Sequence, residues 1–415
     1  MRLLIVGMHN SPHLHRWIET IDDGKATILV FPVLRVEAPM PAHFRCIGPA
    51  DVHAGLAPGV WVVEPPAISS AEELAAYATW DFMRCTHSFV PTDYLASPAR
   101  LRAVMRRFRP DILHSLETQM AGYLCLDSLA DLDDSPPWIA SGWGSDLELF
   151  RRFERHQKVL RRFCSSIDYF LPDCARDIAT ARRFGYAGPS IESMPATGGG
   201  DIEQLAAMAT TAPSARRSII VKGYHHWAGR GLLALSALAL IRDRLAGISV
   251  GILSPAPQAQ TWAARMRAHF GLDVEALPFL ATPADAMMRM ASARMVIGIS
   301  ISDGLPTTVL EAMTVGAFPV QTSSSCVDEW IVDGETGLLV SPHDTAEMAE
   351  AITRALTDDA LVDNAARRNL DTVRRRWSQT LNRQRVWELY RSIASTPRSR
   401  TASSVGSWSI FGESG

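Results

Sequence analysis

Asp303 and Glu311 bracket a turn that leads from the apolar run 296–299 into a helical pattern. Pro306 lies between them, and proline is typical of a first helical position because its missing N–H is not needed there. The N–H groups at the start of a helix are unpaired and carry a partial positive charge, which suits a phosphate or a sugar hydroxyl. The spacing therefore predicts a site for a polar ligand. The alternative is a turn aspartate followed by a solvated helical glutamate.

A second polar cluster follows the apolar run 218–221 and contains Lys222, Gly223, His225 and Arg230. In an α/β unit, the loop after the first strand presents backbone N–H groups and a helix N-terminus to a phosphate. Cations in such a loop would neutralise the charge of a bound phosphate. We interpret this loop as a phosphate site. In the alternative interpretation its cations are surface charges.

Three turns in the N-terminal half carry further candidate side chains. Each of these turns follows or ends an apolar run, and the candidates are His9, Asn10, His114, Trp143 and Asp146. We expect His9 and Asn10 to face a cleft between two domains. Asp146 is either a ligand-binding residue or the N-cap of the helix that follows it.

The elements that position these turns alternate between short apolar runs and helix-length segments, which indicates an α/β fold with parallel sheets. The predicted strands are residues 3–6, 27–31, 60–63, 111–114, 138–141, 169–171, 191–194, 218–221, 248–253, 274–277, 296–299, 318–322 and 337–340. A Gly-, Pro- and Thr-rich stretch near residue 200 indicates a domain boundary. The predicted parts are a Rossmann-like domain over 1–205, a second over 206–375, a closing helix over 376–395 that returns to the first domain, and a disordered tail over 396–415.

The composition is that of a globular protein of 415 residues, with 47% hydrophobic residues and a formal net charge of -3. This charge balance argues against binding to nucleic acid by bulk electrostatics. No apolar run is long enough for a signal peptide or a membrane span, so we expect a cytoplasmic protein. The segment 147–163 combines arginines with phenylalanines. It is either a core helix with a solvated basic face or a contact with an anionic membrane surface.

The run from Asp303 to Glu311, continued by Ala312-Met313 and the turn 316–320, resembles the retaining GT-B glycosyltransferases of the family 4 type. The similarity extends through residues 333–340. In the N-terminal half it is weaker, because Trp143 stands where this family usually has a histidine. In the phosphate loop, His225 stands where the family has an arginine. The resemblance implies a GT-B fold, in which two Rossmann-like domains face each other across a cleft.

The resemblance also assigns roles to the candidate residues. The carboxylate of Glu311 is expected to accept hydrogen bonds from ribose hydroxyls, and Asp303 with its loop is expected to hold the transferred sugar. Residues expected to carry the reaction are Asp303, Lys222 and Arg230. Residues expected to bind the nucleotide sugar are Glu311, Gly304, Leu305, Thr307, Thr308, Gly223, His225, Phe279 and Leu280. Residues expected on the acceptor side are His9, Asn10, His114, Trp143 and Asp146.

The implied activity is transfer of a sugar from a nucleotide diphosphate sugar to a hydroxyl acceptor, with retention of the anomeric configuration. The expected acceptor is a lipid-linked or surface-polysaccharide glycan of a bacterium, reached in the cytoplasm or at the inner face of the cell membrane. No cofactor is expected, and the lack of a DxD-type motif at the predicted cleft predicts a metal-independent reaction. Two alternatives are a nucleotide-sugar epimerase or hydrolase of the same fold, and a non-catalytic scaffold.

Overall fold

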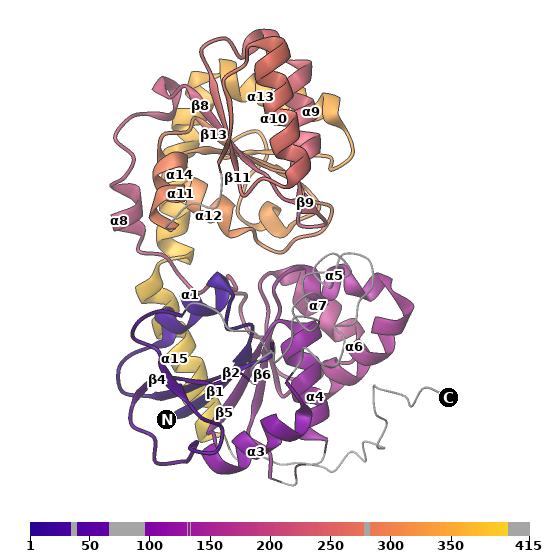
Figure 1. The fold of residues 1–415 in the computed structure, drawn as a ribbon, viewed down its shortest axis with the longest axis vertical. Helices are drawn as coiled ribbons and strands as arrows, with labels where there is room; N and C mark the ends of the chain where they lie inside the picture. Colours follow the sequence, from indigo (N-terminus) through magenta and orange to yellow (C-terminus); the bar gives the residue numbers. More distant parts are fainter. Residues whose placement is uncertain (35–39, 66–95, 131, 133, 278–282, 397–415) are drawn as a thin grey trace. The chain divides into compact units, whose positions relative to one another are not determined.

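The chain folds into two α/β units, which Figure 1 shows in a computed structural model. The structure describes residues 1–34, 40–65, 96–130, 132, 134–277 and 283–396. Unit 1 comprises Met1–Gly198 and Arg383–Gly415, and unit 2 comprises Gly199–Asn382. The predicted boundary at 205/206 lies a few residues beyond Gly198.

Unit 1 contains a sheet of seven strands in the order β3-β4-β2-β1-β5-β6-β7, and all neighbouring strands are parallel. Its strands are β1 (Arg2–Gly7), β2 (Thr27–Pro32), β3 (Arg45–Ile47), β4 (Gly59–Val63), β5 (Ile112–Leu116), β6 (Trp138–Ser141) and β7 (Tyr169–Leu171). Its helices are α1 (Pro12–Ile21), α3 (Pro98–Phe108), the π-helical turn Thr118–Gly122, α4 (Tyr123–Leu129), α5 (Ser145–Glu148), the 3-10 turn Phe150–Arg152, α6 (Glu154–Ser166), α7 (Ala175–Arg183) and α15 (Gln379–Ser395).

Both faces of this sheet are buried, which explains why its central strands are continuous apolar runs rather than alternating ones. In β1, Leu4 and Val6 belong to one core cluster with residues of α3, α4 and α6. Leu3 and Ile5 point to the opposite face and join a cluster with residues of α1 and α15. The helix α15 therefore completes the core of unit 1.

Unit 2 contains a sheet of six parallel strands in the order β12-β11-β8-β13-β14-β15. Its strands are β8 (Ser218–Lys222), β11 (Ser249–Leu253), β12 (Val274–Leu277), β13 (Met295–Gly298), β14 (Phe318–Thr322) and β15 (Leu338–Val340), and a separate antiparallel hairpin joins β9 (His225–His226) to β10 (Gly229–Arg230). Its helices are α8 (Ile202–Ala206), α9 (Gly231–Leu240), α10 (Pro257–Phe270), α11 (Pro283–Ala291), α12 (Thr307–Thr314), α13 (Thr345–Thr357) and α14 (Asp359–Arg376), with 3-10 turns at Pro213–Ala215, Arg242–Arg244 and Cys326–Glu329.

The structure confirms all six strands predicted for unit 2 and six of the seven predicted for unit 1. The prediction of a strand over Ile191–Met194 is wrong: Met194 donates its N–H to Pro172, but no ladder forms. The strand β3 is missing from the prediction, because Arg45 and Cys46 at this edge position are exposed and give no apolar pattern. The predicted tail lies outside the described residues, except Thr396. Among the described residues, no helix is both long and apolar enough to cross a membrane.

The two chain segments that connect the units form backbone hydrogen bonds with each other within unit 2. Gly200 N donates to Trp377 O, and Gln379 N donates to Gly200 O, both at 2.9 Å. A Cβ atom at Gly199 would lie 2.4 Å from Gln379 Cα, so only glycine allows this close approach of the two backbones. Beyond Asn382, α15 enters unit 1, where Arg383 Nε donates to Thr20 O at 2.8 Å.

Candidate functional site

The candidate site of unit 2 lies at the point where the strand order of its sheet reverses. From β8 the chain continues outward through β11 to β12, whereas from β13 it continues in the other direction to β14 and β15. The strands β8 and β13 are neighbours and parallel, so the loops that follow them start from the same sheet edge. In open α/β sheets, ligands bind in the crevice at the carboxyl ends of such strands. The two predicted polar clusters are the loops after β8 and after β13 (Figure 1).

Lys222 and Asp303 form an ion pair that joins these two loops. The Lys222 Nζ atom lies 3.1 Å from Asp303 Oδ2, and the side chains are only 14% and 15% exposed. Asp303 also accepts a hydrogen bond from Gly304 N through its other oxygen, at 3.0 Å. The Nζ atom of Lys222 lies 5.5 Å from the centroid of the Tyr224 ring, within range of a cation–π interaction. The structure thus brings together two residues that the sequence places in separate motifs.

The loop after β8 is a hairpin fixed to the end of β13. Arg230 N donates to Ile299 O at 2.6 Å, and Ile301 N donates to Trp227 O at 2.9 Å. Gly223 allows the tight start of this loop, since a Cβ atom there would lie 2.7 Å from Leu253 O. The hairpin was not predicted, because its two strands are each two residues long and have no apolar alternation.

Arg230 lies directly before helix α9, at its N-cap position. Its Nε atom is inaccessible to solvent and has no hydrogen-bond partner, and no ion pair of Arg230 is found in the part of the chain that the structure describes. An unpaired buried donor is rare in folded proteins and indicates a missing acceptor. His225 pairs with Arg230 across the hairpin, and partial burial together with the Arg230 charge lowers the pKa of His225. Arg230 is therefore the permanently charged residue of the hairpin.

The helix α12 begins at Thr307, one residue later than predicted, with Pro306 as its N-cap residue. Pro306 provides no side-chain cap for the first N–H groups of the helix. Gly304 and Leu305 are buried, whereas Thr307 and Thr308 are half-buried. Gly304 O accepts a hydrogen bond from Cys326 N at 3.0 Å, which fixes the turn before the helix.

Glu311 is half-buried on the second turn of α12, between the buried Leu310 and Ala312. The core-facing residues of the helix include Val309 and Leu310, so Glu311 does not belong to its core face. The predicted base-contacting residues Phe279 and Leu280 lie outside the described residues.

The candidates of unit 1 also lie beside a reversal of strand order, here between β1 and β5. His9 is buried, and its carbonyl accepts a hydrogen bond from His15 Nε2 at 2.7 Å, while Asn10 is exposed. The ring of His13 packs edge-on against Trp143, with centroids 5.3 Å apart. The helix α1, which follows the turn after β1, thus contacts the turn after β6.

His114 has a structural role that the sequence motif does not reveal. It is fully buried, and its two ring nitrogens contact Tyr390 OH at 2.8 Å and Ser141 Oγ at 2.7 Å. Burial lowers the pKa of His114 to about 3, so the ring is neutral. Because both nitrogens are used within unit 1, His114 anchors α15 to the sheet, and we remove it from the acceptor-side set.

Asp146 is not the N-cap of the helix that follows it. It is the second residue of α5, and Gly144 is the N-cap residue. Asp146 Oδ2 accepts hydrogen bonds from Trp143 N at 2.8 Å and from Thr118 N at 2.9 Å. The carboxylate is buried and therefore holds main-chain turns in place rather than facing solvent.

Sequence reasoning missed Glu117 and Asp177, two further buried acids of unit 1. Burial raises the pKa of Asp177 to about 8, and burial and the Asp146 charge raise the pKa of Glu117. Neither residue stands in a recognisable motif. Glu117 adopts a φ of 83°, a conformation that usually signals glycine, so its sequence position gives no indication of the turn.

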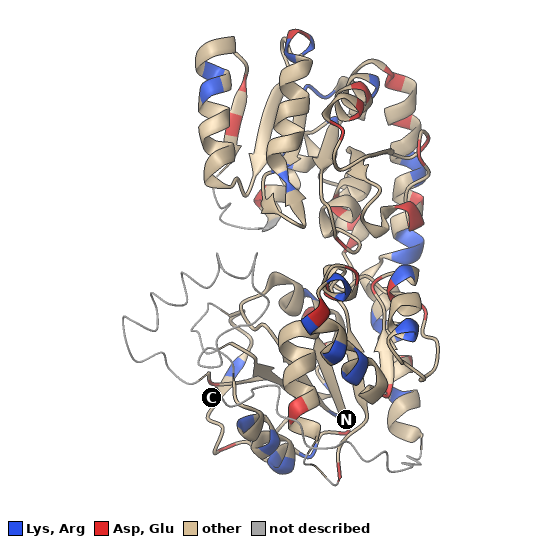
Figure 2. Cartoon of the chain, turned by 90° about the vertical axis from the view of Figure 1, so that its right-hand side faces the viewer, with Lys and Arg blue, Asp and Glu red and all other residues tan. Residues whose placement is uncertain are grey.

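The segment 147–163 contains the end of α5, the 3-10 turn Phe150–Arg152 and most of α6, and α6 packs into the core of unit 1. Val159, Leu160 and Phe163 on α6 are buried, whereas Phe153 is 44% exposed. Glu148 pairs with both Arg151 and Arg152, at 2.6 and 3.1 Å. Figure 2 shows basic and acidic residues on both units. The apolar residues of α6 are thus accounted for by the core.

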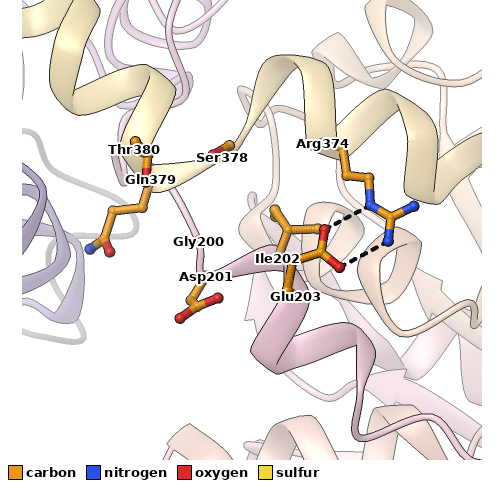
Figure 3. Close-up of a pocket in the computed structure, with 8 residues that line it drawn as sticks. All are labelled: Gly200, Asp201, Ile202, Glu203, Arg374, Ser378, Gln379 and Thr380. Atoms are coloured by element: carbon orange, nitrogen blue, oxygen red, sulfur yellow. Dashed lines mark hydrogen bonds and ion pairs between the residues drawn. The ribbon is translucent and has the colours of Figure 1, made fainter.

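A cavity of about 370 Å³ lies within unit 2 where the connecting segments meet. Figure 3 shows Glu203 and Arg374 pointing toward each other, joined by two hydrogen bonds of 2.8 and 2.9 Å. Asp201 caps α8 by accepting a hydrogen bond from Gln204 N. The charged side chains that line this cavity therefore already form hydrogen bonds within the protein, and we do not assign a ligand to the cavity.

Two family models match the chain. Residues 217–358 match glycosyl transferases group 1, and residues 61–173 match glycosyl transferase 4-like proteins. No curated protein sequence matches the chain.

Solved structures share the fold over nearly the whole chain. Sucrose-phosphate synthase from Thermosynechococcus elongatus is 14% identical with a TM-score of 0.66, covering 95% of this chain and 99% of that one. Anabaena HepE, solved with UDP-glucose, is 14% identical with a TM-score of 0.65, covering 94% and 100%. The α,α-trehalose 6-phosphate synthase from Burkholderia multivorans is 14% identical with a TM-score of 0.66, covering 95% and 99%. The family matches to both units, on a fold of two Rossmann-like units, show that the chain belongs to the GT-B glycosyltransferases of the group 1, family 4 type.

Proposed function

We propose that unit 2 binds a nucleotide diphosphate sugar at the carboxyl ends of β8 and β13, and that the chain transfers the sugar to a hydroxyl acceptor. The observation that carries this proposal is the Lys222–Asp303 ion pair, together with the buried Arg230 Nε atom of the same loop, which has no hydrogen-bond partner. Cations suit a diphosphate, and a carboxylate next to them suits a sugar hydroxyl. Anabaena HepE, which shares the fold, has been solved with UDP-glucose, and this supports a nucleotide-sugar donor.

In this proposal Arg230 and the N–H groups at the start of α12 hold the diphosphate. Arginine matches phosphate oxygens with a planar fork of donors, and the start of α12 adds a partial positive charge. Lys222 neutralises the charge that develops on the leaving group. Asp303 accepts a hydrogen bond from the transferred sugar, and Glu311 accepts hydrogen bonds from the ribose.

Transfer with retention follows from attack on the same face that the leaving group departs from. The bond from the anomeric carbon to the diphosphate oxygen breaks, and a bond from that carbon to the acceptor oxygen forms. The acceptor proton passes to the departing phosphate oxygen, so the chain needs no separate base. The cations Lys222 and Arg230 supply the charge stabilisation that this step needs, and we propose a metal-independent reaction.

On the acceptor side we propose a lipid-linked or surface-polysaccharide glycan, bound in the cytoplasm or at the inner face of the cell membrane. The contact between His13 and Trp143 supports an aromatic surface near the acceptor, because aromatic rings offer an apolar face with a polar edge. The exposed Phe153, flanked by the basic residues of segment 147–163, supports peripheral membrane contact.

The experiment is a thermal-unfolding series with UDP, GDP and ADP and their sugar conjugates, followed by product analysis with each conjugate that binds. A nucleotide at about 100 times its Kd raises the free energy of unfolding by about 2.7 kcal/mol. Arg230→Leu should weaken binding at least about tenfold, because it removes a charge-assisted hydrogen bond worth about 1.5–3 kcal/mol. Arg242→Leu is the matched control, since Arg242 is an exposed arginine of the same unit.

The outcomes separate the alternatives. Released nucleotide with a free or epimerised sugar, and no transfer to any glycan, would support a hydrolase or epimerase. Absence of stabilisation by every nucleotide would support a scaffold.

A further inference from the structure

Glu117 occupies a position in unit 1 that the proposed reaction does not yet use. It directly follows β5, which neighbours β1 at the reversal of strand order. Asp146 lies at the start of α5, directly after the turn that follows the next strand, β6. Both acids are 6% exposed and therefore lie inside the protein, at the sheet edge where ligands of such folds bind.

The backbone of Glu117 is strained. Its φ is 83° and its ψ is 144°, a region that residues other than glycine avoid. The five residues that follow, Thr118–Gly122, form a π-helical turn, and such turns are rare and concentrate at functional sites. Glycine would adopt this conformation without strain, so the carboxyl group must supply something that glycine cannot.

The carboxyl group of Glu117 caps this π-helical turn. Its oxygens accept hydrogen bonds from Gln119 N at 2.7 Å and from Met120 N at 2.6 Å. The N–H of Glu117 donates to Ser141 O at 3.0 Å, at the end of β6. One residue thus orients the turn and bonds it to the neighbouring strand.

Asp146 extends this arrangement to the turn that carries Trp143. Its Oδ2 atom accepts hydrogen bonds from Thr118 N and Trp143 N, at 2.9 and 2.8 Å. Its carbonyl accepts a hydrogen bond from Gln119 Nε2 at 2.8 Å. The Asp146 carboxylate therefore links the turn that follows Glu117 to the main chain of Trp143.

We propose that Glu117 and Asp146 are a positioning pair, which holds Trp143 in the orientation that the acceptor side requires. This inference rests on the proposed function for its acceptor, but the geometry it describes is independent of the donor. Burial and the charge of Asp146 raise the pKa of Glu117. Other titratable groups near the pair include Tyr123 on α4, whose charge interacts with both acids, and Asp177 on α7, which interacts with Asp146 and has Arg176 and Asp173 beside it.

The test follows Trp143 directly by 19F NMR of the full chain labelled with 5-fluorotryptophan. Loss of one resonance in Trp143→Phe assigns the signal. We expect Glu117→Gln and Glu117→Gly to shift or broaden the Trp143 resonance and to leave that of Trp377, in unit 2, unchanged. Glu154→Gln is the control, since Glu154 is an exposed acid on α6.

A purely structural role predicts a different result. The variants would then unfold at a lower temperature, while the Trp143 resonance of the folded protein would stay as in the wild type, and this would overturn the proposal. If the variants do not fold, a pH titration of the wild type replaces them. The Trp143 resonance should then shift with a midpoint above the ordinary pKa range of carboxyl groups. A resonance that does not change between pH 5 and 9 would overturn the proposal. Nucleotide binding should be unchanged in the Glu117 variants, so a wild type that binds no nucleotide would refute the proposed function and not the pairing.

Discussion

Replacing either partner of the Lys222–Asp303 pair should change nucleotide affinity in opposite directions. Their charged atoms are 3.1 Å apart, which at an effective dielectric constant of about 20 corresponds to a Coulomb attraction of about 5 kcal/mol. Lost hydration offsets most of this attraction, and for side chains about one-seventh exposed we expect a net coupling of about 1–2 kcal/mol. A bound diphosphate competes with Asp303 for Lys222, so this coupling opposes nucleotide binding.

Asp303→Asn should therefore bind UDP about tenfold more tightly than the wild type, because Lys222 becomes available and a nearby negative charge is removed. Lys222→Met should bind UDP about 10–150-fold more weakly, because it removes a charge-assisted hydrogen bond worth about 1.5–3 kcal/mol. Isothermal titration calorimetry at constant ionic strength measures both effects. Asp243→Asn is the control, since it removes an exposed carboxylate of unit 2 that lies 3.8 Å from Arg242. Weaker UDP binding by Asp303→Asn would refute the reasoning, because it would mean that Asp303 only supports the loop.

Three further predictions concern the histidine anchor, the connecting segments and the ribose site. His114 is neutral in the folded protein but protonates in the unfolded chain below pH 6.5. The free energy of unfolding should therefore be unaffected by His114 protonation above pH 6.5, and should fall by on the order of 4 kcal/mol as the pH is lowered toward 3. Urea unfolding at several pH values should show a smaller loss in His114→Gln, and an equal loss would contradict this. Gly199→Ala should lower the Tm by several degrees more than Gly55→Ala does, because the Cβ atom added at position 199 would lie 2.4 Å from the Gln379 backbone. Equal Tm values for the two variants would show that the two connecting segments separate easily. Glu311→Gln should weaken UDP binding about tenfold and leave the affinity for inorganic pyrophosphate unchanged, and calorimetry showing equal losses for both ligands would argue against a ribose contact.

The central strands could be predicted because they are buried on both faces and are therefore continuous apolar runs. This held for the central strands β1 and β8. It failed at the edge strand β3, where the exposed Arg45 gives no apolar signal, and at Ile191–Met194, where Glu192 and Ser193 interrupt the apolar pattern and no pairing with the sheet forms.

The donor residues could be predicted individually, but their pairing could not. Lys222 and Asp303 are 81 positions apart, and only the parallel register of β8 and β13 brings them together. His114 shows the opposite case. A family motif marks it as a site residue, but its partner Tyr390 lies 276 positions away and places it in the core. Glu117 gave no signal, since no local pattern predicts a strained glutamate.

The most direct test of the donor site uses the fact that the sequence contains only three lysines, Lys25, Lys158 and Lys222. Methylating their amines with a 13C label preserves the charge and gives each lysine its own NMR signal, and Lys222→Arg assigns the signal of interest. Adding UDP should shift the Lys222 signal and leave those of Lys25 and Lys158, both exposed in unit 1, unchanged. An unshifted Lys222 signal at a UDP concentration that stabilises the protein would contradict the account, because the nucleotide would then bind elsewhere.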